Sequence, residues 1–222
     1  MTRFFVGLDL GQAQDYTAIS VLEKIKKTEE QTVEEMVEVS NPYALWESRW
    51  ETRQVTREIS QPAHYQCRHL KRFPLGTRYP AIVEQVKTML ATPELRGDNT
   101  LVVDATGAGR PVVDMFTQAG LSPVAVTITG GHAVTYDKGM NYVPKRVLVS
   151  ILQVLAQSER IKTAPIEYRE VLNNEMLNFQ LTVTEAANDT YAGRSGTHDD
   201  LVLAVALAAW KAENVREMKF TF

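Results

Sequence analysis

The sequence predicts an α/β fold in which a mixed sheet is flanked by helices. In the second half of the chain, short apolar runs typical of strands alternate with segments whose apolar residues recur at helical spacing. Acids stand at the ends of two strand-like runs, Asp9 and Asp104, and a pair of acids, Asp199 and Asp200, precedes a long apolar segment near the C-terminus. The alternation indicates a partly parallel sheet, and parallel strands that end at one edge would bring these acids together.

Composition narrows the classes of protein that need to be considered. A chain of 222 residues with 44% apolar content can bury a full core, and one decorated α/β domain is the favoured organisation. The charged fraction of 23% and the net charge of −3 argue against disorder and against a uniformly basic nucleic-acid-binding surface. The single cysteine, Cys67, excludes an internal disulfide and a Cys-based zinc site. With no signal peptide or membrane-spanning run, the sequence predicts a cytoplasmic protein without a membrane partner.

The first two strands are expected at 4–10 and 17–25, joined as an antiparallel hairpin by a turn that carries Asp15. A third, weakly alternating run follows at 32–39. Asp9 lies inside the first apolar run. Because a lone charge is rarely buried unless something pairs with it, Asp9 requires a partner, and a divalent cation suits that role.

Residues 41–80 are expected to form an irregular basic insertion. Arg and Lys side chains outnumber acids in this segment and are interleaved with aromatic residues. Cations contact phosphates and aromatic rings stack on bases, so the pattern predicts a nucleic-acid contact. An exposed insertion whose aromatic residues belong to the core explains the same pattern equally well. The cations expected to bind nucleic acid here are Arg68, Lys71 and Arg72.

The rest of the chain is expected to follow the alternating α/β pattern. Lys145 and Arg146 lie in the first turn of one predicted helix, where cations oppose the helix dipole, so we expect them to meet an anion. Thr197 or Asp199 is the expected N-cap of the last helix. Helices are predicted at 81–90, from Pro111 to Gly120, from Pro144 to Gln157, at 166–179 and from 201 onward, strands at 100–103 and 123–128, a loop at 129–142, and a hairpin of 181–184 with 190–193.

The acids Asp9, Asp104, Asp199 and Asp200 are the predicted catalytic residues. Brought together at one sheet edge, they could hold two divalent metals, one to activate a water and one to stabilise the leaving oxygen. Oxygen ligands favour Mg²⁺ or Mn²⁺ over zinc, and a cation would remove the repulsion between the acids. Taken singly, each acid is an ordinary turn or cap residue, so the prediction depends on the combination.

Four segments in this order resemble a known family. They are GLDLGQAQDYTAISVLE, LVVDATGAGRPVVD, the PKR helix start and GTHDDLVLAVALAAW. They resemble the ribonuclease H-like superfamily of nucleases and integrases, and within it the nuclease domain of the large terminase subunit of tailed bacteriophages, from Phe4 to Trp210. The resemblance implies a ribonuclease H-like mixed five-stranded sheet flanked by helices, with a basic insertion and a C-terminal hairpin. It also implies a metal-dependent endonuclease that cuts double-stranded viral DNA during packaging, with a phage or prophage origin in a bacterial host cell.

Carried over by position, the resemblance makes Asp9, Asp104 and one or both of Asp199 and Asp200 metal ligands, with Asp15 as an additional acid near a second metal. Terminase large subunits carry an ATPase motor ahead of this domain, whereas this sequence has no Walker A pattern. We therefore expect an isolated nuclease domain or a free-standing relative. Its partners would be double-stranded DNA and a separate packaging ATPase, small terminase subunit or portal.

Two other classes of protein remain open at this point. Sugar kinases and actin-like ATPases use Asp-x-Gly loops after strands to hold phosphates, so GLDLG and DATGAG could be nucleotide-binding turns. Those proteins generally need a second domain, and the acid pair before the last helix has no role in them. A catalytically inactive nuclease-like DNA-binding module is the other alternative, although it would have no reason to keep several buried acids together.

Overall fold

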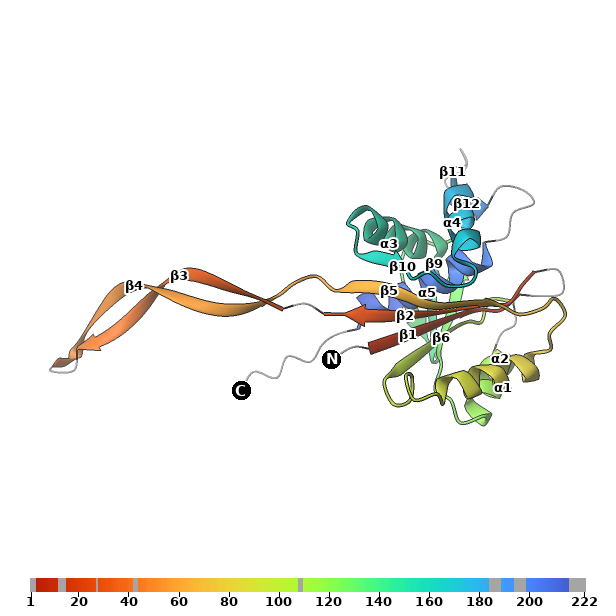
Figure 1. Ribbon diagram of the computed structural model, residues 1–222, viewed down its shortest axis with the longest axis horizontal. Coiled ribbons are helices and arrows are strands. Elements are labelled where there is room, and N and C mark those ends of the chain that lie inside the picture. Colours follow the sequence, from red (N-terminus) through yellow and green to blue (C-terminus); the bar gives the residue numbers. More distant parts are fainter. Residues whose placement is uncertain are drawn as a thin grey trace. The chain divides into compact units, whose positions relative to one another are not determined.

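The computed structural model describes residues 3–11, 15–26, 28–41, 44–107, 110–183, 189–193 and 199–215 (Figure 1). It divides into two compact units, one formed by Met1–Ile25 with Tyr65–Phe222 and the other by Lys26–His64. The first unit carries every predicted site residue. In the described part of the chain, no helix reaches the length and hydropathy needed to cross a bilayer.

The larger unit is built on one mixed sheet whose centre is the predicted first hairpin. β1 (Arg3–Asp9) pairs antiparallel with β2 (Ala18–Ile25) on one side and parallel with β6 (Asn99–Asp104) on the other. The sheet has eight strands in the order β10-β5-β2-β1-β6-β7-β9-β8. The remaining strands are β5 (His64–Arg72), β7 (Val124–Thr129), β8 (Thr135–Asp137), β9 (Met140–Pro144) and β10 (Ile161–Thr163).

The α/β class with a mixed, helix-flanked sheet is confirmed, but the expected five strands are too few. The loop predicted over 129–142 contains β8 and the start of β9, which are joined by a turn at Lys138 and Gly139, both with positive φ (47° and 84°). Glycine adopts this backbone readily, so a residue that appeared to mark a loop in fact closes a tight hairpin. The sheet also gains β5, from the segment expected to be irregular, and the three-residue edge strand β10.

Helices cover both faces of this sheet, as Figure 1 shows. α1 (Tyr79–Leu90) and α2 (Arg110–Gln118) pack on one face, where Ile82, Val86 and Phe116 join a core with the apolar residues of β1 and β6. α5 (Asp200–Glu213) lies on the other face, with α3 (Lys145–Gln157) and α4 (Arg169–Asn178) beside it. Because α5 lies between the sheet and these helices, almost its whole circumference is buried, which explains its nearly continuous apolar sequence.

The smaller unit corrects the expectation of an irregular insertion over 41–80. β3 (Thr28–Asn41) and β4 (Ala44–Ser60) form a long antiparallel ribbon, and residues 64–72 of the segment enter the main sheet as β5. β3 carries five Glu and no Lys or Arg, while the three Arg of β4 are matched by three Glu. The cations of β4 therefore face an acidic partner strand, as the 2.7 Å ion pair between Arg57 and Glu35 illustrates. The predicted C-terminal hairpin is confirmed as β11 (Phe179–Val183) with β12 (Asp189–Gly193).

The close approach of β1 to α5 depends on Gly7. A Cβ atom at this position would lie 1.9 Å from the carbonyl oxygen of Ala204 and 3.0 Å from the backbone nitrogen of Ala208. Both contacts are with the backbone of a buried helix, so neither can be relieved by rotating a side chain. The glycine thus lets α5 lie directly against the strand that ends in Asp9.

We predict that Gly7→Ala destabilises the protein by about 3 kcal/mol or more, because the added methyl group must push α5 away from the sheet. Urea unfolding followed by circular dichroism measures this change. Gly130→Ala is the matched control, because a Cβ atom there meets nothing within 4 Å, and it should change stability by less than about 0.5 kcal/mol. Equal stability of the two variants would contradict the close approach.

Candidate active site

Asp9 and Asp104 lie side by side at the carboxyl ends of two neighbouring parallel strands. Leu8 is in register with Val103, so the next residue of each strand is the acid. Both residues are buried, with exposed fractions of 9% for Asp9 and 6% for Asp104. The predicted meeting of these two acids at one sheet edge is what the structure shows.

The charges of the other three predicted catalytic acids all act on Asp9. Burial raises the pKa of Asp9 well above its ordinary value, and the charges of Asp104, Asp199 and Asp200 raise it further. Burial also raises the pKa of Asp104, opposed by hydrogen bonds from Thr106, including its backbone N–H at 2.7 Å. The hydrogen bond between the two carboxyl groups raises the pKa of Asp9 and lowers that of Asp104.

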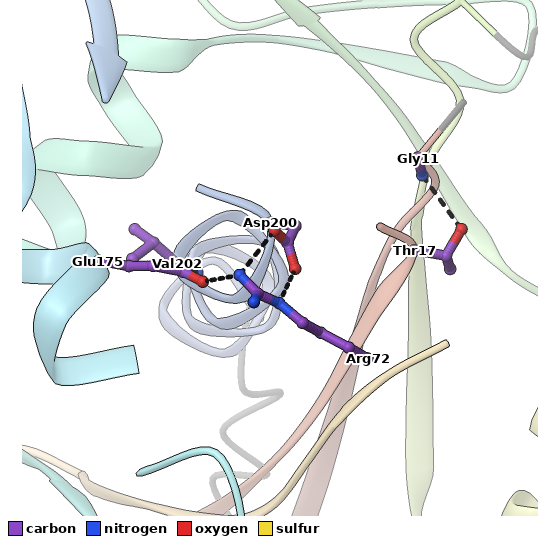
Figure 2. A network of polar contacts seen from close by, with 6 residues as sticks. All are labelled: Gly11, Thr17, Arg72, Glu175, Asp200 and Val202. Atoms are coloured by element: carbon purple, nitrogen blue, oxygen red, sulfur yellow. Dashed lines mark hydrogen bonds and ion pairs between the residues drawn. The ribbon is translucent and has the colours of Figure 1, made fainter. Parts of the chain in front are cut away.

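Asp199 and Asp200 stand at the first turn of α5, and each is paired with a cation. Lys145 Nζ donates to Asp199 at 2.8 Å. Arg72 donates to both carboxylate oxygens of Asp200, from Nε at 2.7 Å and from a terminal nitrogen at 3.0 Å (Figure 2). Asp199 occupies the N-cap position but its side chain makes no capping hydrogen bond, which corrects the expectation of an Asp199 cap; Thr197 lies outside the described residues.

Glu175 of α4 also belongs to this site, and it was not predicted from the sequence. Its carboxylate accepts hydrogen bonds from Arg72 and from the backbone N–H of Val202 (Figure 2). Its exposed fraction is 7%. Burial raises its pKa to about 7, with the charge of Asp200 adding to the rise and Val202 and Arg72 opposing it. The sequence feature that could have indicated Glu175 is its position three residues after the apolar Leu172, which places it on the buried face of the helix.

Asp15, the predicted additional acid, lies elsewhere. Its side chain is exposed, and it lines a cavity of about 340 Å³ together with Gly11, Thr17, Thr77 and other residues. The charges that raise the pKa of Asp9 are those of Asp104, Asp199 and Asp200, and Asp15 is not among them. A metal role for Asp15 therefore stays a prediction.

The residues predicted to bind DNA do not form a single patch. Arg68 pairs with Glu23 at 2.5 Å, and Lys71 donates to Gln85 at 2.8 Å. Arg146 donates to the carbonyl oxygen of His132 at 2.9 Å. The other two, Lys145 and Arg72, lie against the site carboxylates. Arg72 in particular is largely buried, with a side chain 15% exposed, so its described contacts are with the protein's own acids.

The donor set suits a hard divalent cation by its chemistry, because it consists of carboxylate oxygens whose charges repel one another. Among the described residues, however, no three His, Cys, Asp or Glu side chains are arranged to hold a metal ion. The ion pairs account for this, since Asp199 is turned to Lys145 and Asp200 to Arg72. The four carboxylates, Asp9, Asp104, Asp199 and Asp200, therefore have the right chemistry to bind a metal. To do so, Asp199 and Asp200 would have to bind the metal with oxygens that now accept hydrogen bonds from Lys145 and Arg72.

The mixed sheet, with its first strand at the centre and helices on both faces, is consistent with the ribonuclease H-like fold of terminase nuclease domains. The structure is similar to the large terminase nuclease of thermophilic phage G20c with bound magnesium, with a TM-score of 0.59 and 18% identity over 95% of this chain and 82% of that one. The same nuclease has been solved with bound cobalt.

Two further nuclease domains share this fold. The large terminase nuclease domain of Thermus phage P74-26 matches with a TM-score of 0.54 and 19% identity over 99% of this chain and 84% of that one. The human cytomegalovirus terminase nuclease domain, soaked in manganese, matches with a TM-score of 0.50 and 13% identity over 97% and 87%. No protein-family model matches the sequence, and no curated protein does. The chain thus has a terminase nuclease-like fold, which confirms the predicted resemblance at the level of structure.

The raised pKa of Glu175 generates a prediction about stability and pH. A carboxyl with a native pKa of about 7 and an ordinary value of 4.5 binds its proton more tightly in the folded protein than in the unfolded chain. Its stabilising contribution is therefore complete below about pH 4.5 and is lost as the pH rises through about 7. We expect Glu175→Gln, which has no proton to lose, to gain stability relative to the unaltered protein by on the order of 2 kcal/mol between about pH 5 and about pH 8.

Urea unfolding at several pH values measures this difference. Glu170→Gln, an exposed change on the same helix, is the control and should follow the unaltered protein at every pH. If the stability difference for Glu175→Gln were constant over the whole range, a pKa near 7 for Glu175 would be wrong.

Proposed function

We propose that this chain is a divalent-metal-dependent endonuclease that hydrolyses phosphodiester bonds in double-stranded DNA. The terminase nucleases that share its fold, one of them solved with bound magnesium, support this proposal. The observation that carries the proposal is the pair of buried, interacting carboxyl groups of Asp9 and Asp104 at adjacent strand ends. Raised pKa values and burial in a group of like charges are typical of functional sites, because such an arrangement is unfavourable for stability alone.

The four acids of the site would hold Mg²⁺ or Mn²⁺ in this proposal. Bound divalent cations would supply Lewis-acid stabilisation of the phosphate undergoing attack and would lower the pKa of a water. Asp9 and Asp104 provide a rigid pair of oxygen donors because their strands are locked in register. Asp199 and Asp200 complete the donor set from the first turn of α5, whose N-terminal dipole favours nearby negative charge, including that of a phosphate.

In this proposal, protonation of Asp9 competes with binding of the divalent cation. Because Asp9 holds its proton more tightly than an ordinary aspartate, the site binds a proton in place of a cation when the pH is low. Cation binding therefore competes with protons and becomes tighter as the pH rises. Lys145, the first residue of α3, pairs with Asp199 and supplies positive charge where a DNA phosphate would approach.

We predict that Asp9→Asn and Asp104→Asn each lower Mn²⁺-dependent plasmid nicking by at least about a hundredfold, because each removes a charged oxygen donor. The fold should persist, since each change removes repulsion within a buried group of acids. Nicking is followed on agarose gels, with circular dichroism as the check on folding. Asp98→Asn, an exposed acid at the opposite end of the strand region, is the matched control and should cleave normally.

The outcome also separates the competing classes of protein. Undiminished nicking by both variants would overturn the assignment. DNA binding without cleavage by the unaltered protein in any divalent ion would support the inactive nuclease-like module. Saturable ATP binding in calorimetry would support the kinase-like alternative.

We also propose that DNA is positioned through its backbone by the solvent-accessible cations of the larger unit, with little sequence preference. Arg68 and Lys71 lie on β5 and Arg146 on α3. The ribbon cations are poor candidates because their strands carry more Glu than Arg.

Our prediction is that the triple variant Arg68→Ala, Lys71→Ala, Arg146→Ala weakens binding to a short DNA duplex in low salt. The slope of log K against log salt should fall by about one for each phosphate that the variant no longer neutralises. The matched control is Arg53→Ala with Arg57→Ala on the ribbon, which removes two cations and should leave the affinity unchanged. Loss of affinity only in the ribbon variant would place the DNA on the other unit.

A further inference from the structure

Glu175 joins three separate elements through its two carboxylate oxygens. Oε1 accepts a hydrogen bond from Arg72 of β5, and Oε2 accepts one from the backbone N–H of Val202 at 3.0 Å, in the first turn of α5. Glu175 itself comes from α4, so one side chain ties α4, β5 and α5 together at the N-terminus of the buried helix (Figure 2).

The guanidinium of Arg72 is held on several sides. Asp200 takes two hydrogen bonds from it, and Glu175 takes a third from the nitrogen that also reaches Asp200. The ring of Tyr16 lies against it, with the guanidinium carbon 4.9 Å from the ring centroid. A planar guanidinium bound by two parallel hydrogen bonds fixes the plane of the carboxylate opposite it. Arg72 thus sets the orientation of Asp200.

The second bond of Glu175 replaces a local helix cap. The first N–H groups of a helix have no partner inside the helix, and an Asp at the N-cap is the usual acceptor. Here Asp199 occupies that position without capping, and Glu175 accepts the N–H of Val202 from a different helix. Because the cap comes from outside α5, the carboxylates of Asp199 and Asp200 are not used to terminate their own helix.

Stability alone does not explain this arrangement. Glu175 and Asp200 are both buried acids that share one cation, so once Glu175 is ionised, above about pH 7, their two negative charges are set against one positive charge. Desolvating charged groups costs more than most buried ion pairs return, and apolar residues in their place are often as stable. What such a network does provide is a single, fixed orientation for each group.

We propose that Glu175 is a positioning residue, which acts through Arg72 and the first turn of α5 to hold Asp200 in the orientation that a divalent cation requires. This inference rests on the proposed function. Each oxygen of Asp200 keeps a lone pair when Arg72 occupies the other, so the carboxylate held by Arg72 still has oxygen donors to share with the cation beside Asp9.

The test is Mn²⁺ binding by isothermal titration calorimetry at about pH 8 without DNA, together with nicking as a function of Mn²⁺ concentration. Glu175→Gln keeps an oxygen for the N–H of Val202 but loses its charge opposite Arg72, and Arg72→Lys keeps the charge but loses the two parallel hydrogen bonds. Each should weaken Mn²⁺ binding about tenfold to a hundredfold and shift the nicking curve by the same factor, with unchanged affinity for a DNA duplex. Glu170→Gln is the control that should leave all three unchanged.

A double-variant comparison separates positioning from general structural support. If Glu175 acts through Asp200, then Glu175→Gln should have no further effect on Mn²⁺ affinity in a protein that already carries Asp200→Asn. Lower thermal stability or activity with unshifted Mn²⁺ affinity in both single variants would overturn the positioning role. Where one variant does not fold, the other still decides the question.

The two proposals fail in different ways. If the unaltered protein binds Mn²⁺ but cuts no DNA, the proposed function is wrong, while the Mn²⁺ affinities of the variants still decide the role of Glu175. If the unaltered protein cuts DNA and the variants bind Mn²⁺ as it does, only the positioning role is wrong. Failure of the unaltered protein to bind Mn²⁺ at all would overturn both.

Discussion

Repulsion between buried carboxylates is the interaction on which the rest of this structure depends. Asp9, Asp104, Asp200 and Glu175 are all withdrawn from water, and their charges act on one another at short range. Two responses to that repulsion are visible in the structure. The pKa of Asp9 is raised beside its hydrogen-bonded neighbour Asp104, and Arg72 and Lys145 lie against Asp200 and Asp199 at the start of α5. In both cases the carboxylate oxygens could bind a divalent cation instead.

The acids meet because two backbone constraints act together. Parallel pairing of β1 with β6 sets Asp9 beside Asp104, and the absence of a side chain at Gly7 lets α5 lie against the centre of β1. The first turn of α5 then reaches the same edge of the sheet as the strand ends. Neither constraint involves an acid, so the geometry of the site is set by apolar and backbone contacts, and the carboxylates are placed by them.

Much of this could be predicted from the sequence where local patterns are strong. Asp9 and Asp104 each end an apolar run, and an acid pair opens the last apolar helix, so their meeting followed from the rule that parallel strands end at one edge. Of the ribbon, only part of β3 was predicted, as the weakly alternating run at 32–39, because a two-stranded sheet exposed on both faces has no apolar face to produce a regular alternation. β8 and β9 were taken for a loop in a glycine-containing segment, where Gly139 in fact closes a turn.

Arg72 and Glu175 show a different limit. Arg72 was assigned to DNA because it lies in a run of cations, yet its partners come from α4 and α5, more than a hundred residues later in the chain. Glu175 lies in a helix of ordinary polar composition, and only the packing of α4 against α5 buries it. Pairs of opposite charge that meet through tertiary structure leave no spacing in the sequence from which either could be found.

The ribbon of β3 and β4 has a consequence for how such a protein can vary. It is inserted between β2 and β5, which are neighbours in the main sheet, so the chain leaves and re-enters that sheet at adjoining strands. The entropic cost of closing a loop rises only slowly with its length, and none of the ribbon's described side chains is buried. The segment can therefore lengthen, shorten or change its surface charge over evolution without disturbing the carboxylates, which lets a constant chemistry be combined with a changeable exterior.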